Sequence, residues 1–420
     1  MSLLSFDDAL QRLLEGVAAL PLRETEQLPL PAALGRVLAQ AQQAEINVPA
    51  QDNSAMDGYA VRVVDVPQAG TCLPVAQRIP AGSVGHALQP GTAARIFTGA
   101  PVPVGADAIV MQEACEPLPD AGQVRIQQPP QAGDWIRRLG EDIRQGEPLL
   151  AAGTRLNAAQ LGLAASVGIA TLPVYRRLRV GLLSTGNELL MPGQVAPADL
   201  PPGSIYNSNR FLLQGLLARL GCEVGDLGTV PDNLAATRVV LREAASRYDL
   251  VLSSGGVSVG EEDHVKPAVQ AEGELALWKI AIKPGKPLAF GFLRAVEGAG
   301  DGQAQRATFI GLPGNPVASF VTFVLLVRPC ILKLQGASAW ATPPRALPLR
   351  AAFDWPRADA RREFLRARFD AAGELVLHPN QSSGVLTSVD WADGLIDNPP
   401  GQVIRRGDTV RFLPWVELLN

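Results

Sequence analysis

The sequence predicts a protein of several α/β and β domains, organised around a central doubly wound, mostly parallel α/β sheet. Strands and helices alternate from residue 178 to about residue 335, which is the pattern of a parallel sheet with helices on both faces. Short strands split by glycine and proline occupy residues 59–126 and recur after Pro344, which indicates β-rich units on either side. The 420 residues also exceed one ordinary core.

The first helical segment covers residues 6–17, where Phe6, Leu10 and Leu13 share one face. Further helices are expected over 32–41 and 156–167. Because the β-rich piece lies between them, we expect the first helices to pack against residues 141–177. The predicted domains are a helical and linker domain at 1–46 plus 141–177, an inserted β-rich domain at 47–140, the α/β domain at 178–335, and a small C-terminal β-barrel or sandwich at 336–420.

Composition and charge exclude several classes of protein. The chain is 47% hydrophobic and 19% charged, which is typical of a globular protein. A net charge of −4 gives no reason to expect nucleic acid or an anionic membrane as a partner. The longest apolar run, residues 317–327, is too short to span a bilayer, and the N-terminus lacks the pattern of a signal peptide. The four cysteines form no CxxC pair, which favours a reducing, cytoplasmic location.

The α/β pattern places polar loops together. Strands over 178–183, 223–227 and 249–252 are followed by loops and then by helices such as 209–220 and 234–247. Right-handed crossovers bring the carboxyl ends of parallel strands to one edge of the sheet, which is where open α/β sheets bind ligands. We therefore expect the loops after these strands to form the site.

The central stretch of the chain is the glycine-rich turn at 253–263, SSGGVSVGEED. A strand that runs through glycines into a helix leaves backbone N–H groups unpaired, and these favour an anion. Gly255 and Gly256 let a ligand approach the backbone, while Ser254 and Ser258 add hydroxyl groups. The alternative is a plain tight turn between strand and helix.

Three lysines follow this turn. Lys279 and Lys283 are four residues apart in a predicted strand, which would place them on one face, and a Pro-Gly turn then brings Lys283 close to Lys286. Neighbouring ammonium groups repel one another unless an anion lies between them, so we favour an oxyanion site over a solvated turn.

Three carboxylates come from loops at the same predicted edge. Glu188, Asp232 and Asp263 could share a Mg²⁺ ion beside phosphate oxygens. The alternative is helix capping, above all for Asp232, which comes just before the helix at 234. The chain contains no Walker lysine motif, GxGxxG, GxSxG or HExxH, which argues against a kinase-like ATPase, a dehydrogenase, a serine hydrolase and a zinc protease.

Taken together, the motifs closely resemble those of the molybdopterin molybdenumtransferase family, the MoeA type of bacteria, which also occurs as the E domain of gephyrin. The resemblance covers nearly the whole chain, and Asn187 stands where the family usually has aspartate. The matching segments are DNSAMDGYAV at 52–61, FTGAPVP at 97–103, GEDI at 140–143, STGNEL at 184–189, SSGGVSVGEED at 253–263, KIAIKPGKP at 279–287, GLPGNPVASF at 311–320 and NQSSG at 380–384.

The resemblance implies a molybdopterin-binding α/β domain and an enzyme that uses adenylylated molybdopterin and molybdate as substrates. Such an enzyme cleaves the pyrophosphate link with Mg²⁺ present, releases AMP and leaves molybdenum on the dithiolene. The positions that match the family's active cleft are Asp57, Thr98, Asp142, Glu188, Asp232, Asp263, Lys279 and Lys283. The positions that match an oxyanion site for molybdate are Lys283, Lys286, Ser319, Arg361 and Ser382.

The resemblance also implies a homodimer, with the adenylyltransferase and molybdoenzyme apoproteins as further partners. The inserted β-rich domain should project from the body, so we expect Asp57 to act in trans with Lys283 of a second copy. Two other functions remain open: a binding scaffold of the gephyrin type without catalysis, and a nucleotide pyrophosphatase on the same sheet.

Overall fold

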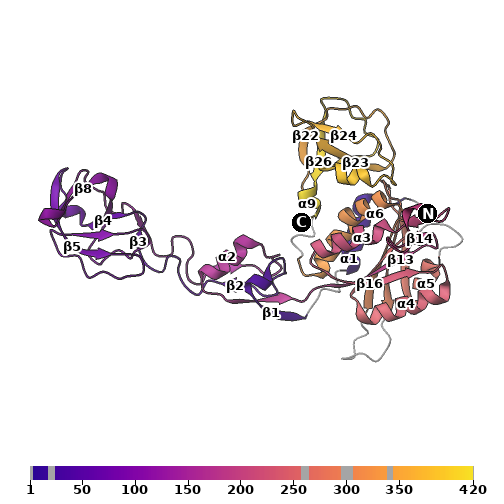
Figure 1. Ribbon diagram of the computed structural model, residues 1–420, viewed down its shortest axis with the longest axis horizontal. Helices are drawn as coiled ribbons and strands as arrows, with labels where there is room; N and C mark the ends of the chain where they lie inside the picture. The colour runs from indigo at the N-terminus through magenta and orange to yellow at the C-terminus, as the bar shows by residue number, and fades with distance from the viewer. Residues whose placement is uncertain (1–2, 18–23, 257–263, 295–305, 338–343, 420) are drawn as a thin grey trace.

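The computed structural model describes residues 3–17, 24–256, 264–294, 306–337 and 344–419. The chain is elongated, with a β-rich module at one end and a larger body at the other (Figure 1). We call residues 53–137 the distal module, and the paired segments 25–43 and 148–175 the arm. The body holds the central α/β sheet, and the C-terminal sheet stands beside it.

The distal module is built on a six-stranded sheet in the order β7-β4-β6-β5-β9-β8. Its two faces pack on two small clusters of buried side chains, one around Val61 and Val124 and the other around Ile79 and Ile109. The strands are β4 (Gly58–Val61), β5 (Thr71–Ile79), β6 (Ala93–Ile96), β7 (Ala108–Met111), β8 (Cys115–Leu118) and β9 (Gln123–Ile126), with the pair β3 (Asn53–Ser54) and β10 (Ile136–Arg137) at the base.

The arm consists mainly of paired strands rather than helices. The expected helix over 32–41 is wrong: this part has a 3-10 turn at Leu30–Ala33, and Gly35 then follows with a left-handed φ of +74°. One helix of this part is present, α2 (Ala158–Ser166), with a capping box between Asn157 and Gln160. The strand pairs are β1 (Thr25–Pro29) with β12 (Thr171–Tyr175), and β2 (Gln42–Gln43) with β11 (Pro148–Leu150).

The body contains the doubly wound sheet, so the predicted fold class is confirmed. Four strands are parallel, and two further strands extend one edge through antiparallel pairing. Their order is β16 (Glu223–Val230), β13 (Arg179–Thr185), β17 (Leu250–Ser254), β21 (Arg306–Leu312), β20 (Pro287–Arg294) and β18 (Gly273–Lys279).

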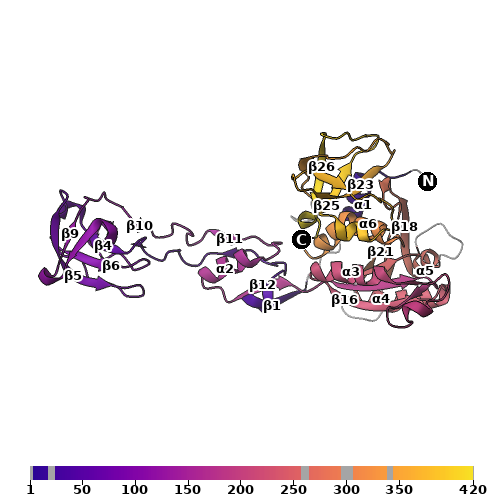
Figure 2. The same cartoon turned by 45° about the horizontal axis from the view of Figure 1, so that its top comes forward.

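Helices cover both faces of this sheet (Figure 2). Val251 packs with α4 and α5, whereas its neighbour Leu252 packs with the helices of the other face, as the period of two requires. One face carries α4 (Leu234–Arg247) and α5 (Val265–Glu272); the other carries α1 (Phe6–Val17), α3 (Ser208–Arg219), α6 (Pro316–Thr322) and α7 (Arg328–Leu334).

Helix α1 belongs to this body. The expectation that it packs with residues 141–177 is wrong, because Leu10 and Leu13 are buried in the cluster that also contains Ile331 of α7. A π-helical turn joins α6 to α7, so the segment Pro316–Leu334 is 19 residues long. By length and composition it could cross a membrane, but 94% of its apolar window is buried inside the protein, as expected of a core helix.

The C-terminal sheet takes one strand from the body. β19 (Ile282–Lys283) pairs in parallel with β23 (Arg362–Phe369). The remaining strands are β25 (Gly394–Asn398), β26 (Thr409–Pro414), β22 (Leu347–Arg350) and β24 (Leu375–Leu377), and the short helices are α8 (Thr387–Trp391) and α9 (Trp415–Leu419). This shared strand holds the loop before β20 between the two sheets.

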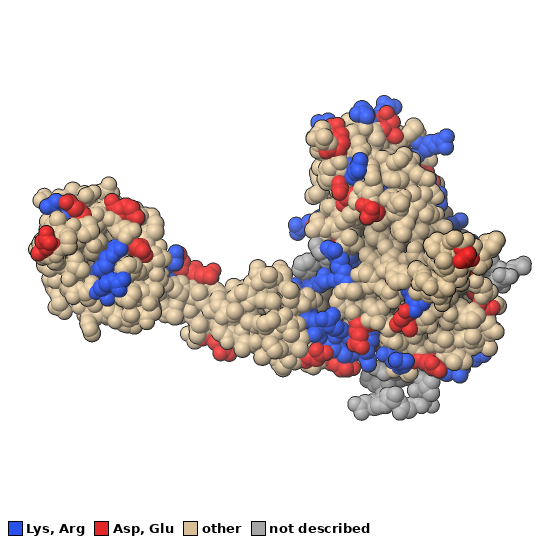
Figure 3. Space-filling view, in the orientation of Figure 1, with Lys and Arg blue, Asp and Glu red and all other residues tan. Residues whose placement is uncertain are grey.

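Basic side chains gather where the arm meets the body (Figure 3). Arg176 follows β12 and makes two hydrogen bonds to the carboxylate of Asp249, at 2.7 and 2.8 Å. Arg155 of the arm donates to the carbonyl oxygen of Arg219 in the body. These arginine contacts fix the direction in which the arm leaves the body.

Candidate active site

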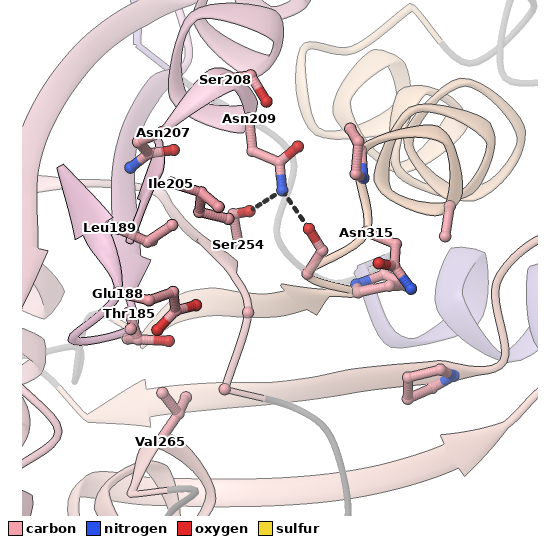
Figure 4. A pocket seen from close by; sticks show the side chains of 18 of the residues that line it. Thr185, Glu188, Leu189, Ile205, Asn207, Ser208, Asn209, Ser254, Val265 and Asn315 are labelled. Carbon is pink, nitrogen blue, oxygen red and sulfur yellow. Dashed lines mark hydrogen bonds between the residues drawn. The ribbon is translucent and has the colours of Figure 1, made fainter. Parts of the chain in front are cut away.

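A cavity of about 710 Å³ lies at the carboxyl ends of the parallel strands of the body. The loops after β13, β17 and β21 form its walls, together with the start of α3 and the turn before β20 (Figure 4). Seven of the residues expected in the site line it: Glu188, Asp232, Ser254, Gly255, Gly256, Lys286 and Arg361. The carboxyl edge of the sheet is thus where most of the expected α/β site residues meet.

The glycine-rich turn forms one wall. Gly255 and Gly256 have φ angles of +88° and +68°, which side chains disfavour. A Cβ at Gly256 would lie 2.3 Å from Val265, so this position has no room for one. The backbone N–H of Gly255 donates to the carbonyl of Leu312, so the expectation that the N–H groups of this turn are unpaired is wrong there. Ser258 lies outside the described residues.

Two of the three expected metal ligands line the cavity. Glu188 follows β13 and Asp232 follows β16, on neighbouring loops. The loops are joined because Asp232 accepts the backbone N–H of Asn187, and the Asn187 side-chain oxygen accepts that of Asp232, each at 3.3 Å. Asp263 lies outside the described residues, and within the described ranges no three acidic, histidine or cysteine side chains are close enough to hold an ion. The Glu188 and Asp232 carboxylates supply the oxygen donors that Mg²⁺ prefers.

The lysines do not share one strand face. Lys279 ends β18 of the central sheet, whereas Lys283 lies on β19 of the C-terminal sheet, because the chain changes sheets between them. The Lys283 ammonium is 2.9 Å from Glu363, whose carboxylate is 1% exposed, and 3.4 Å from Asp359. Its charge is therefore already matched by carboxylates, and Lys286 is the lysine of this trio that lines the cavity.

Arg361 brings a second cation to the cavity. Its guanidinium hydrogen bonds hold the pKa of the Asp359 carboxyl well below its usual range, with a further contribution from Lys283. The Asp359 carboxylate accepts hydrogen bonds from two guanidinium nitrogens of Arg361, at 3.0 and 2.9 Å. Asp359 is therefore the carboxylate that Lys283 and Arg361 share.

The other two residues expected at the oxyanion site, Ser319 and Ser382, do not line the cavity. Ser319 is fully buried in α6, and its hydroxyl has no partner among the described residues. Ser382 is exposed, while its neighbour Ser383 lines the cavity. The NQSSG segment therefore reaches the cavity with Ser383 and not with Ser382.

The expected residues of the distal module and arm are far from this cavity in the same chain (Figure 1). Asp57 accepts hydrogen bonds from the backbone N–H and the hydroxyl of Thr98, both at 2.8 Å. These bonds, the backbone bond foremost, lower the pKa of Asp57, so its carboxylate is charged at neutral pH. Asp142, in the loop that leads back to the arm, is exposed. One chain therefore carries two separate groups of expected site residues.

The cavity also contains residues that the sequence patterns did not single out. They include Tyr206, Asn207, Asn209, His264 and Asn315. Those in the segment YNSN at 206–209 had a signal in the sequence, because polar side chains cluster there at the start of a helix.

Family models match three consecutive parts of the chain. The MoeA N-terminal region (domain I and II) matches residues 4–168, a probable molybdopterin-binding domain matches 181–333, and the MoeA C-terminal region (domain IV) matches 348–415. The three matches together span the distal module, the arm, the body and the C-terminal sheet.

Relatives match over most of their length. A molybdopterin molybdenumtransferase of Haemophilus influenzae is 45% identical over 81% of this chain and 80% of its own. One from Synechococcus elongatus is 37% identical over 95% and 96% of the two chains. The crystal structure of a molybdopterin biosynthesis MoeA protein from Pyrococcus horikoshii superposes with a TM-score of 0.80, at 28% identity over 98% and 100% of the chains.

Proposed function

The chain belongs to the family of molybdopterin molybdenumtransferases, transferases of molybdenum cofactor biosynthesis, and on this premise we propose which reaction its cavity performs. The enzyme takes adenylylated molybdopterin and molybdate, cleaves the pyrophosphate link, releases AMP and leaves molybdenum on the dithiolene. The observation that carries the proposal is one cavity that combines a glycine turn, two carboxylates and two cations at the ends of parallel strands.

In this proposal the cationic side chains of the cavity bind the anionic oxygens of the substrates, and the carboxylates bind the metal ion. Lys286 and Arg361 are the cations of the lining, and they would bind the oxyanion and the phosphate oxygens, Arg361 while it is paired with Asp359. The Glu188 and Asp232 carboxylates would hold Mg²⁺, which supplies positive charge to the phosphate oxygens when it is bound. Ser254 adds a hydroxyl beside Gly255 and Gly256, where no side chain blocks a phosphate.

A second copy of the chain completes the site in this proposal. Asp57 and Thr98 are held as a rigid pair on the distal module, far from the cavity of their own chain. In a two-fold dimer the distal module of one chain would cover the cavity of its partner, which gives two equal sites.

The four cysteines are free, which accords with the proposed cytoplasmic location.

The purified protein tests the reaction directly. Incubated with adenylylated molybdopterin, Mg²⁺ and molybdate, it should release AMP, and omission of molybdate or addition of a chelator should stop or slow the release. AMP that appears at the same rate with and without molybdate would contradict the proposal, because it would indicate a plain nucleotide pyrophosphatase.

Replacing Glu188 by glutamine should raise the Mg²⁺ concentration needed for AMP release. A neutral amide is a poorer ligand for a hard cation, and the exposed Glu188 side chain leaves the core unaffected. The measurement is the rate of AMP release against Mg²⁺ concentration for the two proteins. An unchanged Mg²⁺ dependence would show that Glu188 is not a ligand.

Replacing Lys286 by alanine should weaken molybdate binding by about 1–3 kcal/mol, the scale of a charge-assisted hydrogen bond. Lys283→Ala is the comparison, because Lys283 is held by Glu363 and Asp359 and its loss leaves the buried Glu363 without its ammonium. We therefore expect Lys283→Ala to lower the free energy of unfolding more than Lys286→Ala does. Calorimetric titration with molybdate and urea unfolding measure the two effects; equal molybdate affinity in Lys286→Ala and wild type would refute the assignment.

A further inference from the structure

Asn209 is a nearly buried residue in the wall of the cavity, with 8% of its surface exposed. It is the second residue of α3, yet its side chain points away from the helix toward two loops (Figure 4). Its amide nitrogen donates to the hydroxyl oxygen of Ser254 at 2.9 Å and to the carbonyl oxygen of Gly314 at 2.7 Å. Both hydrogens of one amide group are therefore used to join two loops.

The two loops follow adjacent strands of the sheet. Ser254 is the last residue of β17, and it pairs with Leu312, the last residue of β21, two positions before Gly314. The loops lie so close that a Cβ at Gly314 would be 4.0 Å from the Cα of Gly255. Asn209 thus fixes the distance between the glycine turn and the loop that opens α6.

The Gly314 contact also fixes the polarity of the Ser254 contact. A carbonyl oxygen can only accept, so the NH₂ group of Asn209 must face Gly314, and the same group then donates to Ser254. The Ser254 oxygen is an acceptor in this bond, which leaves its own hydrogen to be donated elsewhere. Among the described residues, no oxygen accepts that hydrogen, and Ser254 lines the cavity.

We propose that Asn209 is a positioning residue that makes Ser254 a hydrogen-bond donor to an anionic oxygen of the substrate. The identity of that anion, a phosphate of the adenylylated pterin, rests on the proposed function. The backbone N–H of Gly255 is already bonded to Leu312, so of these two groups the serine hydroxyl is the one left to donate to a ligand. An aspartate at position 209 would reverse the arrangement, because its carboxylate would accept the serine hydrogen and repel the Gly314 carbonyl.

A double-mutant cycle tests whether Asn209 acts through Ser254. AMP is titrated calorimetrically in the presence of Mg²⁺ into wild type, Asn209→Ala, Ser254→Ala and the double variant. Each single change should weaken AMP binding about 10-fold, and Asn209→Ala should add less than about 3-fold in the Ser254→Ala background. Effects that multiply fully would overturn the proposal, since they would mean that Asn209 acts independently of the serine.

The near-isosteric Asn209→Asp variant gives a second test that does not create a cavity. It should weaken AMP binding more than Asn209→Ala does, and wild-type affinity in Asn209→Asp would overturn the proposal. Asn157→Ala is the control, because it removes the capping box of α2 in the arm and should lower stability while leaving AMP affinity unchanged. Wild type that does not bind AMP would also overturn the proposal. The cycle measures binding alone, whereas the molybdate-dependent release of AMP decides the proposed reaction.

Discussion

Replacing Gly256 by valine should lower AMP release at least about 100-fold, the scale on which a displacement near 1 Å affects a positioned reaction. The new Cβ would lie 2.3 Å from Val265 and 2.9 Å from the Thr185 hydroxyl, so the turn or α5 must move. The φ angle of +68° adds backbone strain of about 1–3 kcal/mol for a β-branched residue. AMP release is measured at saturating substrate and Mg²⁺.

Gly373→Val is the matched control for this change. Gly373 has a similar φ angle of +78° but lies in the turn between β23 and β24 with nothing within 4 Å of an added Cβ. It should therefore suffer the same kind of strain without any effect on the cavity. Loss of activity in Gly373→Val equal to that in Gly256→Val would show that destabilisation, and not the shape of the glycine turn, causes the effect.

Mixing two inactive variants should restore about a quarter of the wild-type sites, if the active site is shared between two chains. One variant carries Asp57→Asn in the distal module, and the other carries Gly256→Val in the body. After random exchange about half of the dimers are mixed, and two-fold symmetry gives each mixed dimer one site with neither lesion. AMP release by the mixture, compared with each variant alone, measures the recovery.

An active site formed within a single chain would give the opposite result. If Asp57 acts on the cavity of its own chain, every site in the mixture keeps one lesion and no activity returns. Mass spectrometry of differently labelled subunits confirms that exchange took place. Zero recovery with confirmed exchange would refute the shared site, and so would a dimer that never forms.

Local sequence signals predicted much of the body. The helix predicted over 234–247 is α4, and it begins at Leu234 because the Asn233 side chain, and not that of Asp232, accepts the N–H groups of Ala235 and Ala236. Alternation of strands and helices predicted the doubly wound sheet, and with it the edge where the expected residues from the loops meet. These features depend on neighbouring residues, which a sequence displays directly.

Features that depend on distant partners were missed. The lysines at 279 and 283 looked like one strand because nothing near them shows that β19 leaves the sheet to pair with β23, about eighty residues later. The arm was expected to be helical. Its strand β1 was missed because the partner strand, β12, lies far along the chain and gives no local signal. Asn209 looked like an ordinary polar residue at a helix start, since Ser254 and Gly314 reach it only in the folded protein.

The ratio of molybdenum transferred to AMP released in a single turnover tests the proposed reaction most directly. Wild-type protein is loaded with adenylylated molybdopterin, given Mg²⁺ and labelled molybdate, and the pterin product is separated and its molybdenum counted. We expect about one molybdenum on the dithiolene product for each AMP, and at least about 100-fold less of both from Gly256→Val in the same time. Release of AMP together with a pterin that carries no molybdenum would contradict it and would identify the enzyme as a pyrophosphatase.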